Sequence, residues 1–153
     1  MEETPLYSRC LSRLQKLCSK AEYCRSTVYA KALKALDGDG EAAARLVESL
    51  VQERYVDDTR YAAAFAREKA SLQGWGPVKI RFQLRAKGIS EASISAALQE
   101  VDASRATDRL EKLLQGKLRT LEEDPQRKLK LIRFALSRGY EYSAVETALT
   151  RIL

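Results

Sequence analysis

Cations of this chain gather in three stretches that contain no acid: residues 23–36, 69–90 and 125–140. Their cations are Arg25, Lys31 and Lys34; then Lys69, Lys79, Arg81, Arg85 and Lys87; then Arg127, Lys128, Lys130, Arg133 and Arg138. Ammonium and guanidinium groups gathered in this way bind phosphates or an acidic protein groove. The alternative is three ordinary solvated helix faces. Each stretch covers the same part of one of the repeated units described below. This agreement favours a real anion-facing surface.

The candidate contact residues come from the second and third stretches. Arg81 and Arg85 are i, i+4 neighbours and can act together. Trp75 stands between two glycines, where it is a contact for a partner or a base, or a lid folded over the core. The full set of candidates for binding a partner or DNA is Trp75, Lys79, Arg81, Arg85, Lys87, Lys130, Arg133 and Arg138.

Groups suited to catalysis are scarce. The chain has no histidine, so acid–base chemistry near neutral pH would need carboxylates or lysines with shifted pKa values. The segment 38–40, GDG, lacks the lysine and hydroxyl of a phosphate-binding loop. Asp57 and Asp58 are adjacent carboxylates before an expected helix, where caps are more common than metal ligands. We therefore expect a protein that is not an enzyme and needs no cofactor.

The three cysteines, Cys10, Cys18 and Cys24, all lie near the start of the chain. An odd number without an export signal favours reduced thiols. Zinc is the alternative, but CxxC and a fourth sulfur are missing, so we expect no metal. The first residues, Met1-Glu2-Glu3, are acidic, and no apolar run is long enough for a membrane span. These features predict a cytoplasmic protein that does not contact a membrane.

The elements that must position these residues are helices. Ala, Leu, Arg, Lys and Glu dominate, and glycine (7) and proline (3) are rare in the 153 residues, which predicts an all-α chain. A glycine, then an aliphatic residue six positions later and a leucine ten positions later, recurs at intervals of 48 and then 51 residues. The three sets are Gly40, Leu46, Leu50; Gly88, Ile94, Leu98; and Gly139, Val145, Leu149. Such a period indicates tandem units, each with a short helix that follows a glycine turn.

Each unit is expected to contain three helices. The first helices are predicted at residues 7–20, 59–72 and 104–121, and the second at 26–36, 77–86 and 125–137. Pro77 and Pro125 suit a first helical turn, and Gly88 and Gly139 suit a left-handed C-terminal cap. The predicted units are 1–56, 57–101 and 102–153. Because each is too small to be stable alone, they should stack into an elongated, curved array.

With these elements placed, the chain resembles the RecX family of recombinase regulators. The resemblance is strongest at residues 55–62, YVDDTRYA, and continues through Phe65, residues 74–76, Ile80, Leu84 and residues 87–89. Residues 131–140, which end in SRGY, resemble the family's third unit. The first unit departs most, because residues 25–29 read RSTVY where the family often has Ser-x-x-Glu-Leu. Together the similar segments cover most of residues 7–150.

The resemblance implies a non-enzymatic regulator that binds the RecA–DNA filament and inhibits its recombinase, ATPase or strand-exchange activity. It also implies a monomer in the bacterial cytoplasm, with a role in DNA repair, recombination and the SOS response. The alternative is a helical module that binds DNA directly, without a recombinase partner, because three-helix units with a basic helix resemble helix-turn-helix readers. Against it, no unit has the Arg/Asn/Gln cluster that reads base edges. A small hydrolase or transferase is a third possibility, disfavoured by the missing catalytic groups.

Overall fold

The computed structural model of this protein describes residues 4–101 and 103–153, and within them it is built from nine α-helices without a strand. The helices are α1 (Pro5–Lys20), α2 (Arg25–Ala35), α3 (Gly40–Gln52), α4 (Asp58–Leu72), α5 (Pro77–Ala86), α6 (Glu91–Glu100), α7 (Ala103–Arg119), α8 (Arg127–Ser137) and α9 (Tyr142–Ile152). The acidic start, Met1-Glu2-Glu3, lies outside the described residues. The predicted all-α fold is confirmed.

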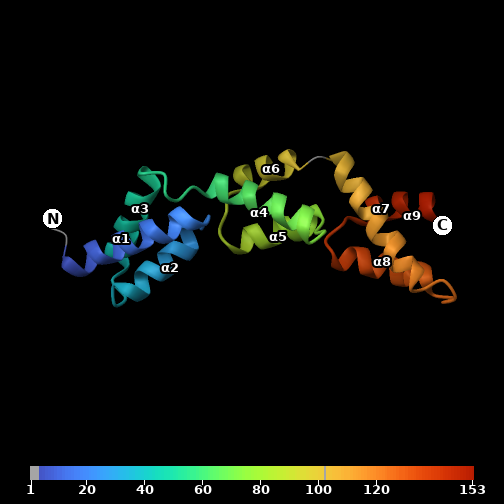
Figure 1. The fold of residues 1–153 in the computed structure, drawn as a ribbon, viewed down its shortest axis with the longest axis horizontal. Helices are drawn as coiled ribbons and strands as arrows, with labels where there is room; N and C mark the ends of the chain where they lie inside the picture. The colour runs from blue at the N-terminus through green and yellow to red at the C-terminus, as the bar shows by residue number, and fades with distance from the viewer. Residues whose placement is uncertain (1–3, 102) are drawn as a thin grey trace.

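The helices form three units in series, and the whole molecule is elongated and curved, with its two ends far apart (Figure 1). Each unit packs three helices around a core of its own. Side chains at the centres of the three cores are Leu46 and Leu50, then Ile80, Leu84 and Ile94, then Leu114, Leu131 and Val145. The expected stacked array is therefore correct, while the unit boundaries at residues 56/57 and 101/102 stay a prediction.

The glycine-based repeat marks the third helix of each unit. Its aliphatic members Leu46, Ile94 and Val145 are completely buried. Gly88 and Gly139 follow the second helices with φ of +77° and +92°, as predicted for left-handed caps. The first unit differs, because Gly40 is already the first residue of α3. There the left-handed turn is made by Asp37 and Gly38, with φ of +56° and +84°, so the expectation of a glycine turn at Gly40 was wrong.

The two prolines behave differently. Pro77 is the first residue of α5, where its missing N–H costs nothing. Pro125 was predicted to start the eighth helix, but it lies in the turn before α8. The side chain of Asp124 accepts the backbone N–H of Gln126 (2.8 Å), which closes that turn around the proline. The helix therefore begins two residues later than the sequence indicated.

The first two units are joined at the N-terminus of α2. Asp58 accepts the backbone N–H of Arg25 (2.8 Å), and the Ser26 hydroxyl donates to the carbonyl oxygen of Lys87 (2.6 Å). Cys24, just before α2, is fully buried in the core of the second unit. The start of α2 thus belongs in space to the second unit as much as to the first.

The second and third units are joined in the same way. The backbone N–H groups of Gly76 and Val78, at the start of α5, donate to the carbonyl oxygens of Arg138 (2.8 Å) and Gly139 (2.9 Å). At both junctions the N-terminus of a second helix meets the C-terminal turn of the next unit's second helix. Opposite ends of helix dipoles attract. At the second junction the free N–H groups of α5 also find carbonyl partners, whereas at the first junction the Ser26 hydroxyl is the donor to the carbonyl oxygen. As a result α2, α5 and α8 form one row along the molecule (Figure 1).

Candidate functional site

The row of second helices brings the basic stretches of the sequence together at the first junction. A groove of about 520 Å³ there is lined by Lys31 and Lys34 of α2 and by Lys87 after α5. Lys87 lies more than fifty residues from Lys31 and Lys34 in the chain. The cations of the first and second units therefore form one continuous surface.

The second junction brings together Trp75, Lys79 and Arg138. The Lys79 ammonium lies 4.4 Å from the centre of the Trp75 ring, and that of Lys69 lies 5.0 Å from it. The guanidinium of Arg138 donates to the carbonyl oxygen of Gln73 (3.4 Å). The indole therefore has two cations on it, an arrangement that cation–π attraction stabilises.

Trp75 also packs against the core of the second unit. Its ring is half-buried and meets Phe65 edge-on, with the ring centres 6.1 Å apart. This packing matches the interpretation of the indole as a lid over the helices. The part of the ring left exposed stays a candidate contact.

Arg81 and Arg85 share one acidic partner. The Arg81 guanidinium lies 3.5 Å from a carboxylate oxygen of Glu91, and Nε of Arg85 donates to the other oxygen. The hydrogen bond from Arg85 lowers the pKa of the Glu91 carboxyl, and the same bond raises the pKa of Arg85. Glu91 is the first residue of α6, just beyond the acid-free stretch. The two arginines are thus partly neutralised by the acid that ends their stretch.

The third unit repeats this relationship. Lys130 pairs with Asp124, the acid just before its stretch, and its hydrogen bond lowers the pKa of that carboxyl. Arg133 is exposed, and no ion pair in the described part of the chain includes it. Among the candidates of α8, Arg133 is therefore the cation most available to a partner.

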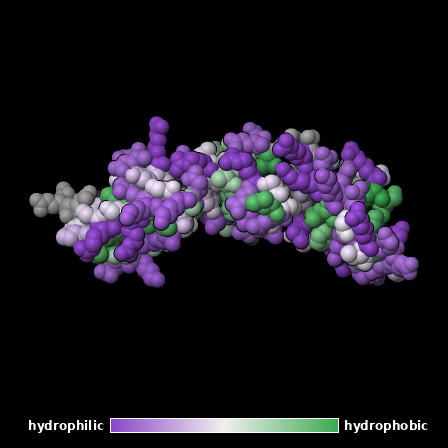
Figure 2. Space-filling model, in the orientation of Figure 1, coloured by the Kyte–Doolittle hydropathy of each residue, from purple (hydrophilic) through white to green (hydrophobic). Residues whose placement is uncertain are grey.

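Sequence reasoning missed Phe82. Its side chain lies on α5 beside Arg81 and is 68% exposed, and Val78, one turn earlier, is 46% exposed. Figure 2 shows hydrophobic areas surrounded by hydrophilic side chains on the visible face. The signal was present, since Val78 and Phe82 lie off the helix face that carries Ile80 and Leu84. Large apolar side chains exposed among cations are typical of a protein contact surface.

The three cysteines are buried, free thiols. Burial raises the pKa of the Cys10 and Cys18 thiols. At Cys24 burial also acts to raise the pKa, but hydrogen bonds with the hydroxyls of Ser26 and Thr27 outweigh it, and the net change is downward. Over residues 4–101 and 103–153 no three histidine, cysteine or acidic side chains gather as a metal site, and no helix is long and apolar enough to cross a membrane.

Comparison with known proteins identifies both the second and the third unit. Residues 57–98 match the family model described as RecX, second three-helix domain, and residues 105–149 match that of RecX, third three-helix domain. Relatives named regulatory protein RecX occur in Clostridium tetani (28% identity; 96% of this chain and 68% of the relative), in Shigella dysenteriae (28%; 89% and 87%) and in Mycobacterium sp. strain JLS (32%; 69% and 61%). The similarity thus extends over nearly the whole described chain.

Two solved structures have the same fold. One is described as the crystal structure of regulatory protein RecX, with a TM-score of 0.85, 26% identity, and coverage of 95% of this chain and 72% of that one. The other is RecX from Lactobacillus salivarius, with a TM-score of 0.85, 20% identity, and coverage of 95% and 96%. The second match, at its lower identity, bears on the fold alone.

Proposed function

Because this chain belongs to the RecX family, we propose that it is a regulator that binds the RecA–DNA filament in the cytoplasm and impedes filament growth, strand exchange and ATP hydrolysis. It acts by binding as a monomer and catalyses no reaction of its own, and the ATP belongs to the recombinase. Its relatives carry the name of regulatory proteins, which supports a regulatory role. The recombinase as partner and inhibition as outcome are our proposal.

The observation that carries this proposal is the row formed by α2, α5 and α8. It places the helices that carry the basic stretches of all three units one after another along a curved molecule (Figure 1), and Lys31 and Lys34 of the first unit share a groove with Lys87 of the second. A filament repeats its subunits along its length, so a row of this kind can touch several of them at once. Multivalent contact gives high avidity from individually weak contacts when the geometry permits simultaneous binding.

The contact residues that we propose are Lys79, Arg81, Arg85 and Lys87 first, then Lys130, Arg133 and Arg138, with Trp75 at the second junction. Phe82 joins this set because its side chain is exposed and lies one helical turn from Lys79 and Arg85 on α5. Aromatic and arginine side chains are enriched at protein interfaces, while lysine is depleted there. Phe82 and the arginines of α5 are therefore expected to contribute most, with the lysines acting at longer range.

The test is to add the protein to recombinase filaments on single-stranded DNA and to follow ATP hydrolysis over a range of salt concentrations. We expect hydrolysis to fall as protein is added, and the effect to weaken as salt rises. Bare duplex DNA is the control. Equal affinity for bare and recombinase-coated DNA, without a change in hydrolysis, would contradict the proposal and favour a module that binds DNA directly.

A further inference from the structure

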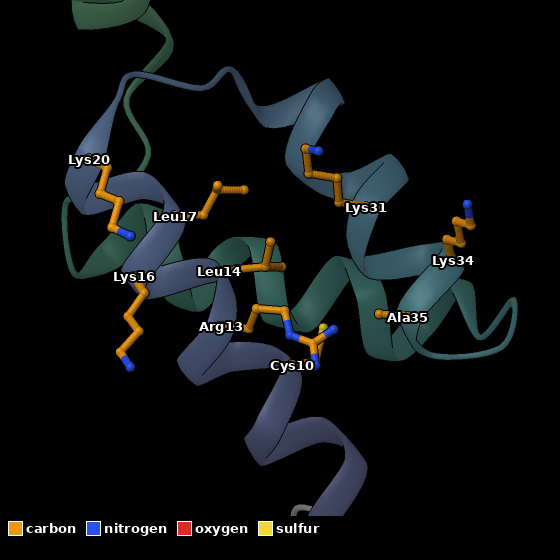
Figure 3. A pocket seen from close by; sticks show the side chains of 9 residues that line it. All are labelled: Cys10, Arg13, Leu14, Lys16, Leu17, Lys20, Lys31, Lys34 and Ala35. Atoms are coloured by element: carbon orange, nitrogen blue, oxygen red, sulfur yellow. The ribbon is translucent and has the colours of Figure 1, made fainter.

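A second surface lies beside the N-terminal end of the row of second helices, in a groove of about 660 Å³ between α1 and α2 of the first unit (Figure 3). Its floor is apolar. Leu14 and Leu17 point from α1 into the space between the two helices, and Cys10 and Ala35 complete the lining. The floor is therefore an apolar trough that one row of apolar side chains from a partner can fill.

The rim of the groove is entirely cationic. Every charged residue that lines it is a lysine or an arginine: Arg13, Lys16, Lys20, Lys31 and Lys34. All five side chains are exposed, and none of them takes part in an ion pair in the part of the chain that the structure describes. The ammonium of Lys31 lies 5.9 Å from the centre of the Tyr23 ring. Unlike the arginines of α5, these cations have no acid of their own.

We propose that this groove docks an acidic amphipathic helix of a partner protein. The apolar face of such a helix would cover Leu14, Leu17 and Ala35, and carboxylates on both edges of that face would meet the cations of α1 and α2. From Cys10 to Lys20 the groove follows α1 for roughly 15 Å, which is about three turns of a bound helix. Binding of an amphipathic helix in an apolar groove is a recurrent mode of recognition.

The chemistry of the floor favours a peptide over nucleic acid. Single-stranded nucleic acid is held by aromatic side chains on which the bases stack. The lining contains only aliphatic and thiol groups between the cations. The cations by themselves would bind the phosphates of a nucleic acid and the carboxylates of a peptide equally well. The apolar floor, which has no ring for a base to stack on, therefore favours the peptide.

The groove is also separable from the proposed filament surface. Arg13, Lys16 and Lys20 lie on α1, outside the row of α2, α5 and α8. Lys31 and Lys34 line both grooves, so variants that test the helix-docking groove belong on α1. The docking of an acidic helix does not depend on the filament proposal.

The experiment titrates the full chain into a fluorescein-labelled synthetic helix that has leucines along one face and glutamates on both sides of that face. Fluorescence anisotropy reports binding in the absence of recombinase and DNA. The test variant is Arg13→Glu/Lys20→Glu, and the control is Lys112→Glu/Arg119→Glu. Both pairs have the same spacing and end at the last residue of a helix, so net charge and helix-dipole effects match. Leu17→Gln tests the floor.

We expect saturable binding that weakens roughly tenfold or more in Arg13→Glu/Lys20→Glu and in Leu17→Gln, and that changes little in the control. A peptide of the same composition with scattered leucines should not bind. Equal loss in test and control variants would overturn the proposal, as would displacement of the peptide by oligothymidine. Self-association that Arg13→Glu/Lys20→Glu abolishes would also overturn it, because the occupant would then be a second copy of this chain.

The same variants in the filament assay separate the two proposals. Arg13→Glu/Lys20→Glu should inhibit ATP hydrolysis as well as the parent while failing to bind the peptide. If Arg13→Glu/Lys20→Glu lost filament inhibition and still bound the peptide, the helix-docking assignment would be overturned. Peptide binding without any effect on filaments would instead contradict only the proposed function.

Discussion

Gly139 lies directly against the backbone of Lys79: a Cβ added at Gly139 would stand 2.2 Å from the Cβ of Lys79 and 2.7 Å from its nitrogen. The carbonyl oxygen of Gly139 meanwhile accepts the N–H of Val78 (2.9 Å). Across the junction, a Cβ at Gly76 would stand 2.4 Å from that same oxygen. The second and third units can approach this closely only because both residues lack a side chain.

Gly139→Ala should therefore break the second junction. Gly88→Ala is the matched control, because Gly88 occupies the same turn position with φ of +77° but has open space around it. Both variants incur the strain of a left-handed alanine, about 1–2 kcal/mol. Gly139→Ala should lose roughly a further 1–3 kcal/mol from overpacking. Urea unfolding and solution scattering would measure stability and shape, and equal losses in both variants would refute this account of the junction.

Asp57 and Asp58 should show separate roles. Asp57 caps α4 by accepting the N–H groups of Thr59 (2.9 Å) and Arg60 (3.1 Å), whereas Asp58 accepts that of Arg25 across the first junction. Asp57→Ala should cost about 1 kcal/mol and speed hydrogen exchange at Thr59 and Arg60. Asp58→Ala should cost about 1 kcal/mol and speed exchange at Arg25. Each variant is the control for the other, and the same exchange pattern in both would contradict the assignment.

Arg81→Ala/Arg85→Ala should weaken inhibition of recombinase filaments and reduce its salt dependence, because two cations of the proposed surface are lost. The fold should remain nearly intact, since exposed substitutions usually cost less than about 0.5 kcal/mol each. Leu84→Ala is the control for a general loss of stability, at about 2–5 kcal/mol, because its side chain is fully buried. If the double variant inhibits ATP hydrolysis as well as the parent at every salt concentration, this part of the surface is only a solvated face.

Glu91→Gln should have the opposite effect. The carboxylate of Glu91 partly neutralises both arginines, so its removal leaves them free for an anionic partner. We expect tighter filament binding and a steeper salt dependence, measured by inhibition of ATP hydrolysis at several ionic strengths. Weaker inhibition would mean that Glu91 holds the arginines in the orientation the partner needs.

Tyr61 should make the protein less stable at alkaline pH. Burial, aided by nearby Cys24, Glu68 and Asp58, raises the pKa of Tyr61 from 10.0 to about 12. Between these values the unfolded chain releases a proton that the folded chain keeps, so the free energy of unfolding falls as pH rises and levels off above about 12. Tyr61→Phe should flatten this fall in urea unfolding at successive pH values. An unchanged slope would assign it to other groups, such as Tyr140, whose pKa is also raised.

Much of the fold was accessible from local sequence patterns. Helix formers, the glycine repeat and Pro77 predicted the first and second helices of each unit to within a few residues and placed the third helices near their glycines. Helical periodicity and capping involve neighbours three or four positions apart, so a sequence records them. The misplaced start of α8 and the turn before α3 came from side-chain and loop geometry that a periodic pattern does not contain. The basic stretches were visible in the sequence, but the acids that pair with their cations in the fold were not.

Which charges meet was decided by the tertiary structure alone. Glu91 turns back onto Arg81 and Arg85, and Asp58 reaches Arg25, whereas the cations that line the groove between α1 and α2 form no ion pair among the described residues. Cys24 precedes a helix of the first unit, yet it is buried in the core of the second. These contacts depend on the angles at which helices pack and units join, and such angles are set by side-chain volume and close backbone approach at a few positions. A linear pattern carries no record of those angles, so only the packed helices reveal which cations remain available to a partner.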